Sequence, residues 1–339
     1  MKIIDSFHFY QELELLEIRL KYLYDYVDHF IILESSQKFN GEKRDFLFEK
    51  NKKIFERYAD KIYYYKLDNF QTSYSSLKEF LTNSRNFIDK NILEFMESHN
   101  HYPKNKLNWV LDTYTREALH HPYSLYVKKD DIVFLSDIDE IPSINFVKFI
   151  KKYFASKKAS KFYIAEQIEF KYFINLMSYS PWYGTIAGRY SNISKTSLNV
   201  LRVDSKFSRK YFDNDPFKNG GFHFSSCGGE KLLLSKIESG GHQEFNFPYM
   251  KKNIFKRICA GYDSFSLTPG RSLKFIDISE TNFFDIKLKR ILLSYKQLML
   301  KKLSKLNTYD HIEIIILFAL IFYKRVVNKI ITLLQCQKN

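Results

Sequence analysis

Two short apolar runs in the first half of the chain constrain its fold most. Residues 29–33 read HFIIL and residues 131–135 read DIVFL, and each run follows a segment with helical periodicity. Runs that are apolar throughout, rather than at alternate positions, are typical of parallel strands buried on both faces. Alternation of such strands with helices predicts an α/β domain in which helices flank a mainly parallel sheet.

The remaining elements of the first half follow the same alternation. Residues 13–27 carry Leu or Val at steps of three and four, which is one stripe of a helix. Beyond Pro142 the pattern is less regular, and shorter strands with polar loops are expected there. We expect further strands at 2–6, 62–67, 162–170, 171–177 and 221–225, and helices at 48–60, 76–99, 108–121 and 228–239.

The chain divides by charge near residue 285. Residues 285–339 contain 11 Lys and Arg against 3 Asp and Glu, which supplies +8 of the net +15. Their longest apolar run, IEIIILFALIFY, is shorter than the roughly 20 residues that a spanning helix needs. We therefore expect one domain over residues 1–284 and a basic amphipathic helical tail over residues 285–339. An anionic membrane surface is the expected partner of this tail.

Cysteine spacing and the first residues bear on the compartment. Cys227, Cys259 and Cys336 are far apart and lack CxxC spacing, which argues against a disulfide framework and a structural zinc site. The opening sequence MKIIDSFHFY has no signal-peptide hydrophobic region. We expect a cytoplasmic protein, peripheral on the inner face of the membrane. No nucleic-acid partner is expected, because the tail lacks the composition of single-strand binders and the chain lacks a zinc-finger signature.

Three carboxylates follow the second apolar run, in the segment FLSDIDEIPS over residues 134–143. In an extended chain Asp137 and Asp139 point to one side, and Glu140 points away from it. Two carboxylates at the carboxyl end of a parallel strand suit a hard divalent cation, and open α/β sheets bind ligands at that end. The alternative is an acidic turn in solvent.

Three blocks of the chain together resemble glycosyltransferase family 17. They are residues 5–44, which begin DSFHFYQELE, residues 136–143, SDIDEIPS, and residues 221–246, which begin GFHFSSCGGE. The resemblance extends over about residues 1–260. It implies an inverting transferase with a GT-A-like fold, a D-x-D site for Mn²⁺ or Mg²⁺, and a UDP-sugar donor, best known as UDP-N-acetylglucosamine. We expect the acceptor to be a surface polysaccharide or a lipid-linked glycan.

With this resemblance, several side chains become candidates for binding the donor. Glu34 follows the HFIIL run and could accept hydrogen bonds from the uridine, whereas Phe7 could stack on the base or pack in the core. Arg116 could contact phosphate, or could form a surface ion pair with Asp112 four residues earlier.

The late block supplies the other candidates. His242 is expected to complete a metal site with Asp137 and Asp139, and His223 is expected to support the donor. Glu230 is the predicted catalytic base, although a carboxylate at that place also stabilises a helix N-terminus. Glu244 and Asp263 are rivals for the base, and Trp182 is either a sugar platform or a core residue.

Two other functions fit parts of the sequence. A basic nucleic-acid-binding or membrane-binding protein without catalysis would use the charge but leave FLSDIDEIPS unexplained. A nucleotidyltransferase would use an acidic metal site, but the chain lacks a Gly-rich phosphate loop after its first strand.

Overall fold

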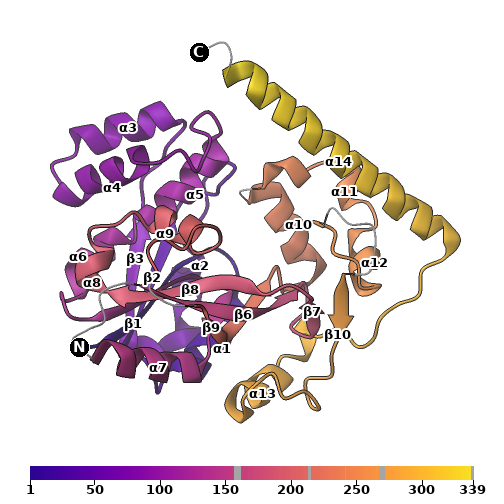
Figure 1. Ribbon diagram of the computed structural model, residues 1–339, viewed down its shortest axis with the longest axis horizontal. Helices are drawn as coiled ribbons and strands as arrows, with labels where there is room; N and C mark the ends of the chain where they lie inside the picture. Colours follow the sequence, from indigo (N-terminus) through magenta and orange to yellow (C-terminus); the bar gives the residue numbers. More distant parts are fainter. Residues whose placement is uncertain (156–161, 213–214, 241, 267–271, 337–339) are drawn as a thin grey trace.

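A ten-stranded mixed sheet forms the centre of the protein in the computed structural model, which describes residues 1–155, 162–212, 215–240, 242–266 and 272–336 (Figure 1). Four neighbouring strands are parallel, in the order β3-β2-β1-β4. They are β1 (Ile3–Phe9), β2 (His29–Ser35), β3 (Ile62–Leu67) and β4 (Ile132–Asp137). The two apolar runs are therefore the strands β2 and β4, as predicted.

The other half of the sheet is mostly antiparallel, so the prediction of a mainly parallel sheet holds only for the first half of the chain. Beyond β4 the order is β8-β6-β7-β10, with each neighbour antiparallel, and β9 pairs parallel with β6 and antiparallel with β5. These strands are β5 (Glu140–Pro142), β6 (Tyr163–Lys171), β7 (Leu176–Ser178), β8 (Trp182–Arg189), β9 (Phe217–Ser225) and β10 (Leu273–Phe275). The sequence prediction missed β8, whose run WYGTIAGR is interrupted by two glycines.

Helices cover both faces of the sheet, because alternate residues of the buried strands point to opposite sides. Phe30 and Ile32 of β2 join one core, and Ile31 and Leu33 join the other. The first core includes α1 (Leu13–Leu23), α7 (Ile144–Ala155) and α13 (Ile286–Leu293). The second includes α3 (Tyr74–Asn83), α4 (Phe87–Glu97), α5 (Leu107–Glu117), α6 (His120–Tyr126), α8 (Tyr190–Ile193) and α9 (Leu198–Asp204).

Two predicted helices of the first half are each divided in the structure. The predicted helix at 48–60 is α2 (Leu47–Asn51) followed by a 3-10 helix over Lys52–Lys61, and the predicted helix at 76–99 is α3 and α4. Ser73 caps α3, and Asn86 caps α4 by accepting a hydrogen bond from the Ile88 amide. A second cap signal inside a periodic run therefore marks the break between α3 and α4.

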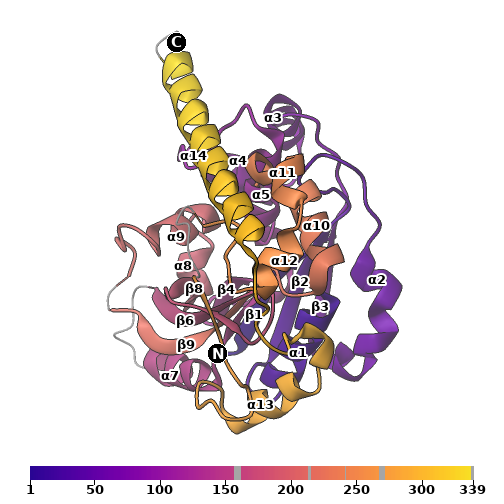
Figure 2. The same cartoon turned by 90° about the vertical axis from the view of Figure 1, so that its right-hand side faces the viewer.

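A smaller third core lies beside the main sheet. It joins α10 (Gly229–Ser239), α11 (Pro248–Lys251), α12 (Ile254–Cys259) and one side of α14 (Thr308–Cys336). Figure 2 shows α14 running along the outside of these three helices. Short 3-10 helices lie at Gln243–Phe245 and Lys296–Leu298. Parts of residues 285–321 thus pack against the rest of the chain, with Leu288 and Leu292 of α13 in the first core and Leu317 and Ile321 of α14 in the third.

The turn between β4 and β5 is held by one buried arginine of α1. Both Arg19 and Asp5 of β1 are fully buried, and the Arg19 Nη2–Asp5 Oδ1 distance is 2.6 Å. The guanidinium also donates to the carbonyl oxygens of Asp137, Ile138 and Glu140 at 2.8, 3.1 and 3.1 Å. The hydrogen bonds from Arg19 of α1 therefore fix the backbone of the D-x-D turn.

Replacing this arginine should therefore destabilise the protein strongly. Arg19→Met leaves the Asp5 carboxylate buried without its partner, and we expect the free energy of unfolding to fall by roughly 3–5 kcal/mol. Urea unfolding measures this difference. The matched control is Arg57→Met, which removes an exposed pair with Glu17 and should cost less than about 1 kcal/mol. Equal losses in the two variants would contradict the role of Arg19.

Candidate functional site

A cluster of charged side chains gathers at the carboxyl ends of β1 and β4. His8 of β1 lies beside Asp137 of β4 in the register of these two strands. The helices α5, α9 and α10 contribute cationic side chains to the cluster, which are Arg116, Arg202 and Lys236. The site therefore lies where the parallel half of the sheet meets the third core.

Both oxygens of the Asp137 carboxylate face cationic groups. Oδ2 lies 3.0 Å from Nη2 of Arg202, and Oδ1 lies 3.4 Å from Nη2 of Arg116 and 3.7 Å from Nδ1 of His8. Burial by itself would raise the pKa of Asp137, but Arg202 and Arg116 outweigh it and hold the pKa well below its usual range. Asp137 is thus an ionised carboxylate shared by two guanidinium groups.

Asp139 has a separate pair of partners. Its Oδ1 lies 3.6 Å from Nε2 of His223, and its Oδ2 lies 3.6 Å from Nζ of Lys236. Burial opposes ionisation of Asp139, but the two cationic neighbours lower its pKa to about 2. On its other side His223 lies 3.4 Å from Glu169 of β6, so this imidazole bridges two carboxylates.

Glu140 is the third carboxylate of this segment, and it is buried beneath the cluster among hydrogen-bond donors. Its fully buried carboxylate accepts hydrogen bonds from Nη1 and Nη2 of Arg202, from the Trp182 indole and from the Asp137 amide. The indole of Trp182 stacks on the His223 ring, and the ammonium of Lys206 lies 3.9 Å from the indole centroid. Glu140 therefore positions Arg202 and Trp182.

Lys206 is the cation in this cluster that lacks an acidic partner. Within the described part of the chain no carboxylate lies in ion-pair distance of its ammonium group, which contacts the Trp182 ring instead. Burial and the nearby Arg202 charge lower the pKa of Lys206 to about 8. Arg116 also has unused capacity, because its buried Nε has no hydrogen-bond partner.

The carboxylates do not fit a divalent cation in this arrangement. Each carboxylate of the D-x-D pair already has cationic groups at both oxygens. A divalent ion about 5 Å from one guanidinium would be repelled by roughly 7 kcal/mol at an effective dielectric constant of about 20. Over the described residues, no group of three His, Cys, Asp or Glu side chains is arranged to hold a metal ion. The cation expected from the sequence stays a prediction.

Two predicted donor-binding residues are buried in structural roles. Phe7 is fully buried in the first core with the Arg19 guanidinium over its ring, so its ring is not available to a nucleobase. Glu34 is also fully buried, and its carboxylate accepts hydrogen bonds from Arg44, the Leu47 and Phe48 amides, and the Tyr64 hydroxyl. The Glu34 carboxylate thus caps the start of α2, and neither of its oxygens is exposed to a uridine.

The other predicted residues are divided between the cluster and the third core. Arg116 and His223 lie in the cluster with Asp137 and Asp139. His242 is exposed, bonds to Glu244 and contacts the Trp109 ring, and no contact in the described residues joins it to the D-x-D pair. Glu230 is exposed in the first turn of α10, which begins at Gly229 with Gly228 as its N-cap, and both glycines have positive φ. The rival Asp263 is buried and bonded to Lys171 and Tyr172.

Sequence reasoning missed Arg202, Lys206 and Lys236. The only local signal is the spacing of four between Arg202 and Lys206, which places two cations on one side of a helical segment. Nothing in that spacing indicates that the pair faces a carboxylate 65 positions earlier in the chain. The pairing becomes visible only in the folded protein.

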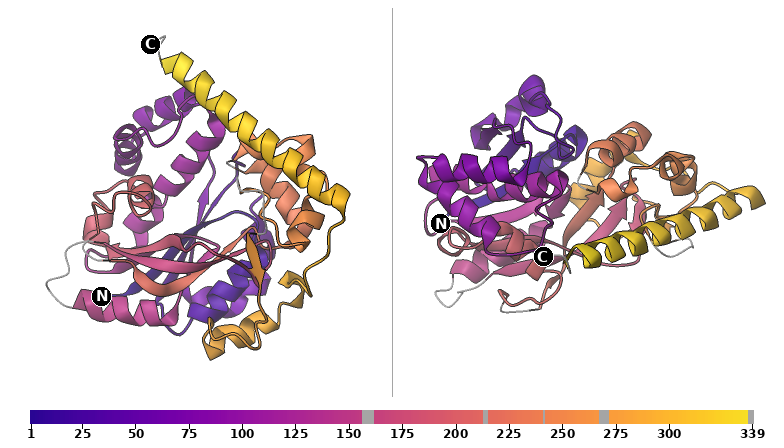
Figure 3. Two further views of the ribbon diagram at one scale, coloured as in Figure 1. Left: turned by 45° about the vertical axis from the view of Figure 1, so that its right-hand side comes forward. Right: turned by 90° about the horizontal axis from the view of Figure 1, so that it is seen from above.

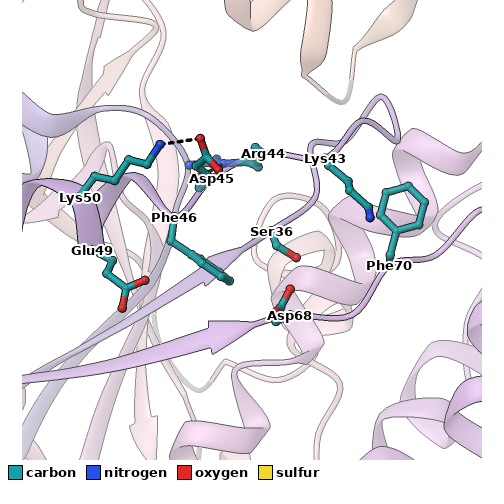
Figure 4. Close-up of a pocket in the computed structure, with 9 residues that line it drawn as sticks. All are labelled: Ser36, Lys43, Arg44, Asp45, Phe46, Glu49, Lys50, Asp68 and Phe70. Carbon is teal, nitrogen blue, oxygen red and sulfur yellow. Dashed lines mark hydrogen bonds and ion pairs between the residues drawn. The ribbon is translucent and has the colours of Figure 1, made fainter.

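A pocket of about 560 Å³ opens at the same end of the sheet, beyond the end of β2 and β3 (Figure 4). Ser36 and Asp68 follow these two strands directly, and Phe46 and Phe70 supply its rings. Lys43 lies over the Phe70 ring, and Lys50 pairs with Asp45. The pocket is two to three strands from Asp137, or about 10–14 Å at ordinary strand spacing.

Comparison with known proteins relates the first part of the chain to one family. Residues 1–85 match the family model "Glycosyltransferase family 17", which supports the resemblance in the first of its three blocks and supports a glycosyltransferase. No curated protein matches the chain. One solved structure, 4-diphosphocytidyl-2C-methyl-D-erythritol synthase from Anaerococcus prevotii, is 12% identical with a TM-score of 0.29, over 70% of this chain and 95% of that chain. A likeness this low carries no argument about function.

The bridge at His223 should make stability depend on pH. Burial lowers the pKa of His223, but Asp139 and Glu169 raise it overall, to about 9. A raised pKa stabilises the folded state below about pH 6.5, and this contribution is lost as the pH rises through about 9. The difference between the two pKa values corresponds to about 3 kcal/mol.

We expect His223→Gln to remove this contribution. Urea unfolding at pH 6.5 and pH 9.5 should show the wild type about 3 kcal/mol more stable than the variant at the lower pH and nearly equal to it at the higher pH. Comparison with the variant isolates His223, because Lys206 titrates in both proteins. A difference that does not change with pH would show that His223 is neutral in the folded protein.

Proposed function

We propose that the chain transfers a sugar from a UDP-sugar to a hydroxyl group of a glycan, with inversion at the anomeric carbon. The observation that carries this proposal is the family match over residues 1–85, which span β1, β2, β3 and the loops at their carboxyl ends. By the precedent of the family, the sugar is N-acetylglucosamine. The charged cluster at the end of β4 lies beside this matched segment.

The donor diphosphate is placed beside Asp137, against Arg116 and Lys206. Lys206 has no acidic partner in the described part of the chain, and the buried Nε of Arg116 has no acceptor. Oxygen atoms of a diphosphate would supply the anionic partner for Lys206 and the acceptor for Arg116, in charge-assisted hydrogen bonds. Asp137 and Glu140 would then hold Arg116 and Arg202 in place rather than contact the donor themselves.

The reaction is a single displacement. The acceptor oxygen forms a bond to the anomeric carbon while the bond from that carbon to the UDP oxygen breaks, and UDP leaves with the bonding electron pair. Arg116 and Lys206 stabilise the charge that develops on the leaving diphosphate. The proton of the acceptor hydroxyl passes to a carboxylate of the protein.

Glu230 stays the sequence-based prediction for this carboxylate, and its placement argues against it. Lys236, which contacts Asp139, lies six residues later on α10. Six residues correspond to about 9 Å along a helix and to a rotation of about 120° between the two side chains. Glu230 instead lies near Cys259 of α12, whose pKa is raised by burial and by this carboxylate.

The acceptor is proposed to be a lipid-linked glycan or a surface polysaccharide under synthesis at a membrane. We place the protein in the cytoplasm, bound to the inner face of that membrane. The support is the basic charge of residues 285–339 and the sequence of α14. None of the described helices is both long and apolar enough to cross a membrane.

The role of Lys206 is tested by replacing its charge. Lys206→Met removes one charge-assisted contact, and we expect the affinity for UDP to fall about tenfold to a hundredfold. Titration calorimetry with UDP measures the affinity. Lys210→Met is the matched control, since Lys210 is exposed and should leave binding unchanged. Equal UDP affinity in wild type and Lys206→Met would remove this residue from the donor site.

The reaction itself is tested with a panel of donors. Purified protein should hydrolyse a UDP-sugar slowly without an acceptor and should not hydrolyse GDP-sugars, and each donor is measured with Mn²⁺ and with EDTA. Release of UDP from UDP-N-acetylglucosamine is the expected result. Failure to bind or hydrolyse every UDP-sugar in both conditions would overturn the proposed function, and activity confined to Mn²⁺ would restore the cation predicted from the sequence.

A further inference from the structure

The helix α14 has one buried face and one exposed face, and both are apolar. Four residues of the buried face pack against α10, α11, α12 and the segment that follows them; they are Ile314, Leu317, Phe318 and Ile321. The exposed face carries seven large apolar residues, at 40–65% exposure: Tyr309, Ile312, Ile315, Ile316, Phe322, Tyr323 and Val326. We call these seven residues the outer face of α14.

The outer face forms one continuous stripe. At 100° per residue its members fall within about 140° of the helix circumference, opposite the buried residues. No charged residue lies within this sector between positions 308 and 326. Figures 2 and 3 show this helix at the outer edge of the protein, over α10, α11 and α12. A continuous apolar stripe on an exposed helix marks a site of interaction rather than scattered surface residues.

The acidic residues of α14 are turned away from the outer face. Asp310 pairs with Lys256 at 2.5 Å, and Glu313 pairs with Lys252 at 2.8 Å and accepts a hydrogen bond from Asn253. These ion pairs tie the first turns of α14 to α12 and to the loop before it. The protein therefore presents the apolar stripe without any negative charge of the helix beside it.

Positive charge lies at the start of the same helix. Lys301, Lys302 and Lys305 precede α14, are exposed, and make no ion pair in the described part of the chain. Each unpaired lysine close to an anionic lipid surface strengthens binding roughly fivefold. An apolar stripe with lysines next to it matches the two layers of a membrane surface, which are acyl chains and anionic headgroups.

We propose that the outer face of α14 docks the protein on an anionic lipid bilayer, with the helix lying in the plane of the membrane. The helix does not cross the bilayer, because its inner face is part of the third core and its acids are paired with the protein. This proposal deepens the membrane binding proposed above for residues 285–339, and it does not rest on the sugar transfer, since no residue of the outer face belongs to the charged cluster.

A second copy of the chain is the other occupant to consider. Two copies that met through this stripe would bring together chains with a net charge of +15 each, and the lysines before α14 would repel each other. An anionic bilayer turns the same charge into attraction. Charge complementarity therefore favours lipid over self-association.

The experiment uses the full chain and vesicles of phosphatidylcholine, with or without one quarter phosphatidylglycerol. The wild type should sediment with the anionic vesicles. The variant Ile312→Ser, Ile315→Ser and Phe322→Ser should bind them roughly tenfold or more weakly. The matched control replaces three exposed apolar residues elsewhere, Phe80→Ser, Phe87→Ser and Leu125→Ser, and should bind like the wild type. Thermal unfolding checks that both variants are folded.

A second variant tests the electrostatic part. Lys301→Gln, Lys302→Gln and Lys305→Gln together should weaken binding to anionic vesicles about a hundredfold and reduce its salt dependence. No binding of the wild type, or equal binding of the wild type and the outer-face variant, would overturn the proposal. A wild-type dimer in light scattering that the outer-face variant converts to a monomer, without vesicle binding, would assign the stripe to a second copy instead.

Discussion

The buried ion pair between Arg19 and Asp5 is the constraint on which the rest of the site depends. All five donor hydrogens of this guanidinium can be accounted for by the Asp5 carboxylate, the Ser136 hydroxyl and three backbone carbonyls of the 137–140 turn. Carbonyls of a turn that follows a buried strand need such donors, and the Glu140 carbonyl also accepts a hydrogen bond from the Thr185 hydroxyl. Because α1 supplies these donors, the carboxylates of Asp137 and Asp139 are presented from a fixed backbone.

Fixing that backbone has an electrostatic consequence. Three carboxylates in four residues would repel one another, and the protein compensates them with side chains from distant segments rather than leaving them in solvent. Arg202 is the central compensating group, because it pairs with both Asp137 and Glu140. The acidic segment therefore works as a scaffold that orients cations, and Lys206 and the Nε of Arg116 are among the groups left with unused capacity.

Local patterns in the sequence predicted the features that depend on neighbouring residues, which are the positions of strands and helices. The apolar runs became β2 and β4, the helix predicted at 228–239 is α10, and the position of Asp137 at a strand end was confirmed. The candidates that depend on distant partners could not be judged in this way. Phe7 and Glu34 lie near strand ends, where ligand contacts are expected. However, the Arg19 guanidinium covers the Phe7 ring, and the Glu34 carboxylate accepts hydrogen bonds from the first amides of α2. Arg202 and Lys236 carry no local signal of their destination, since their partners are 62 or more positions away.

The third core connects the two proposed surfaces of the protein. Lys236 of α10 contacts Asp139, and its neighbours Leu233 and Ile237 belong to the same core as Leu317 and Ile321 of α14. One layer of helix thus separates the charged cluster from the outer face of α14. A protein held to a membrane through that face would keep its cluster at a fixed distance from the lipid surface, because the core between them is packed. That geometry suits an acceptor attached to a lipid, whose reactive hydroxyl also lies at a limited distance from the bilayer.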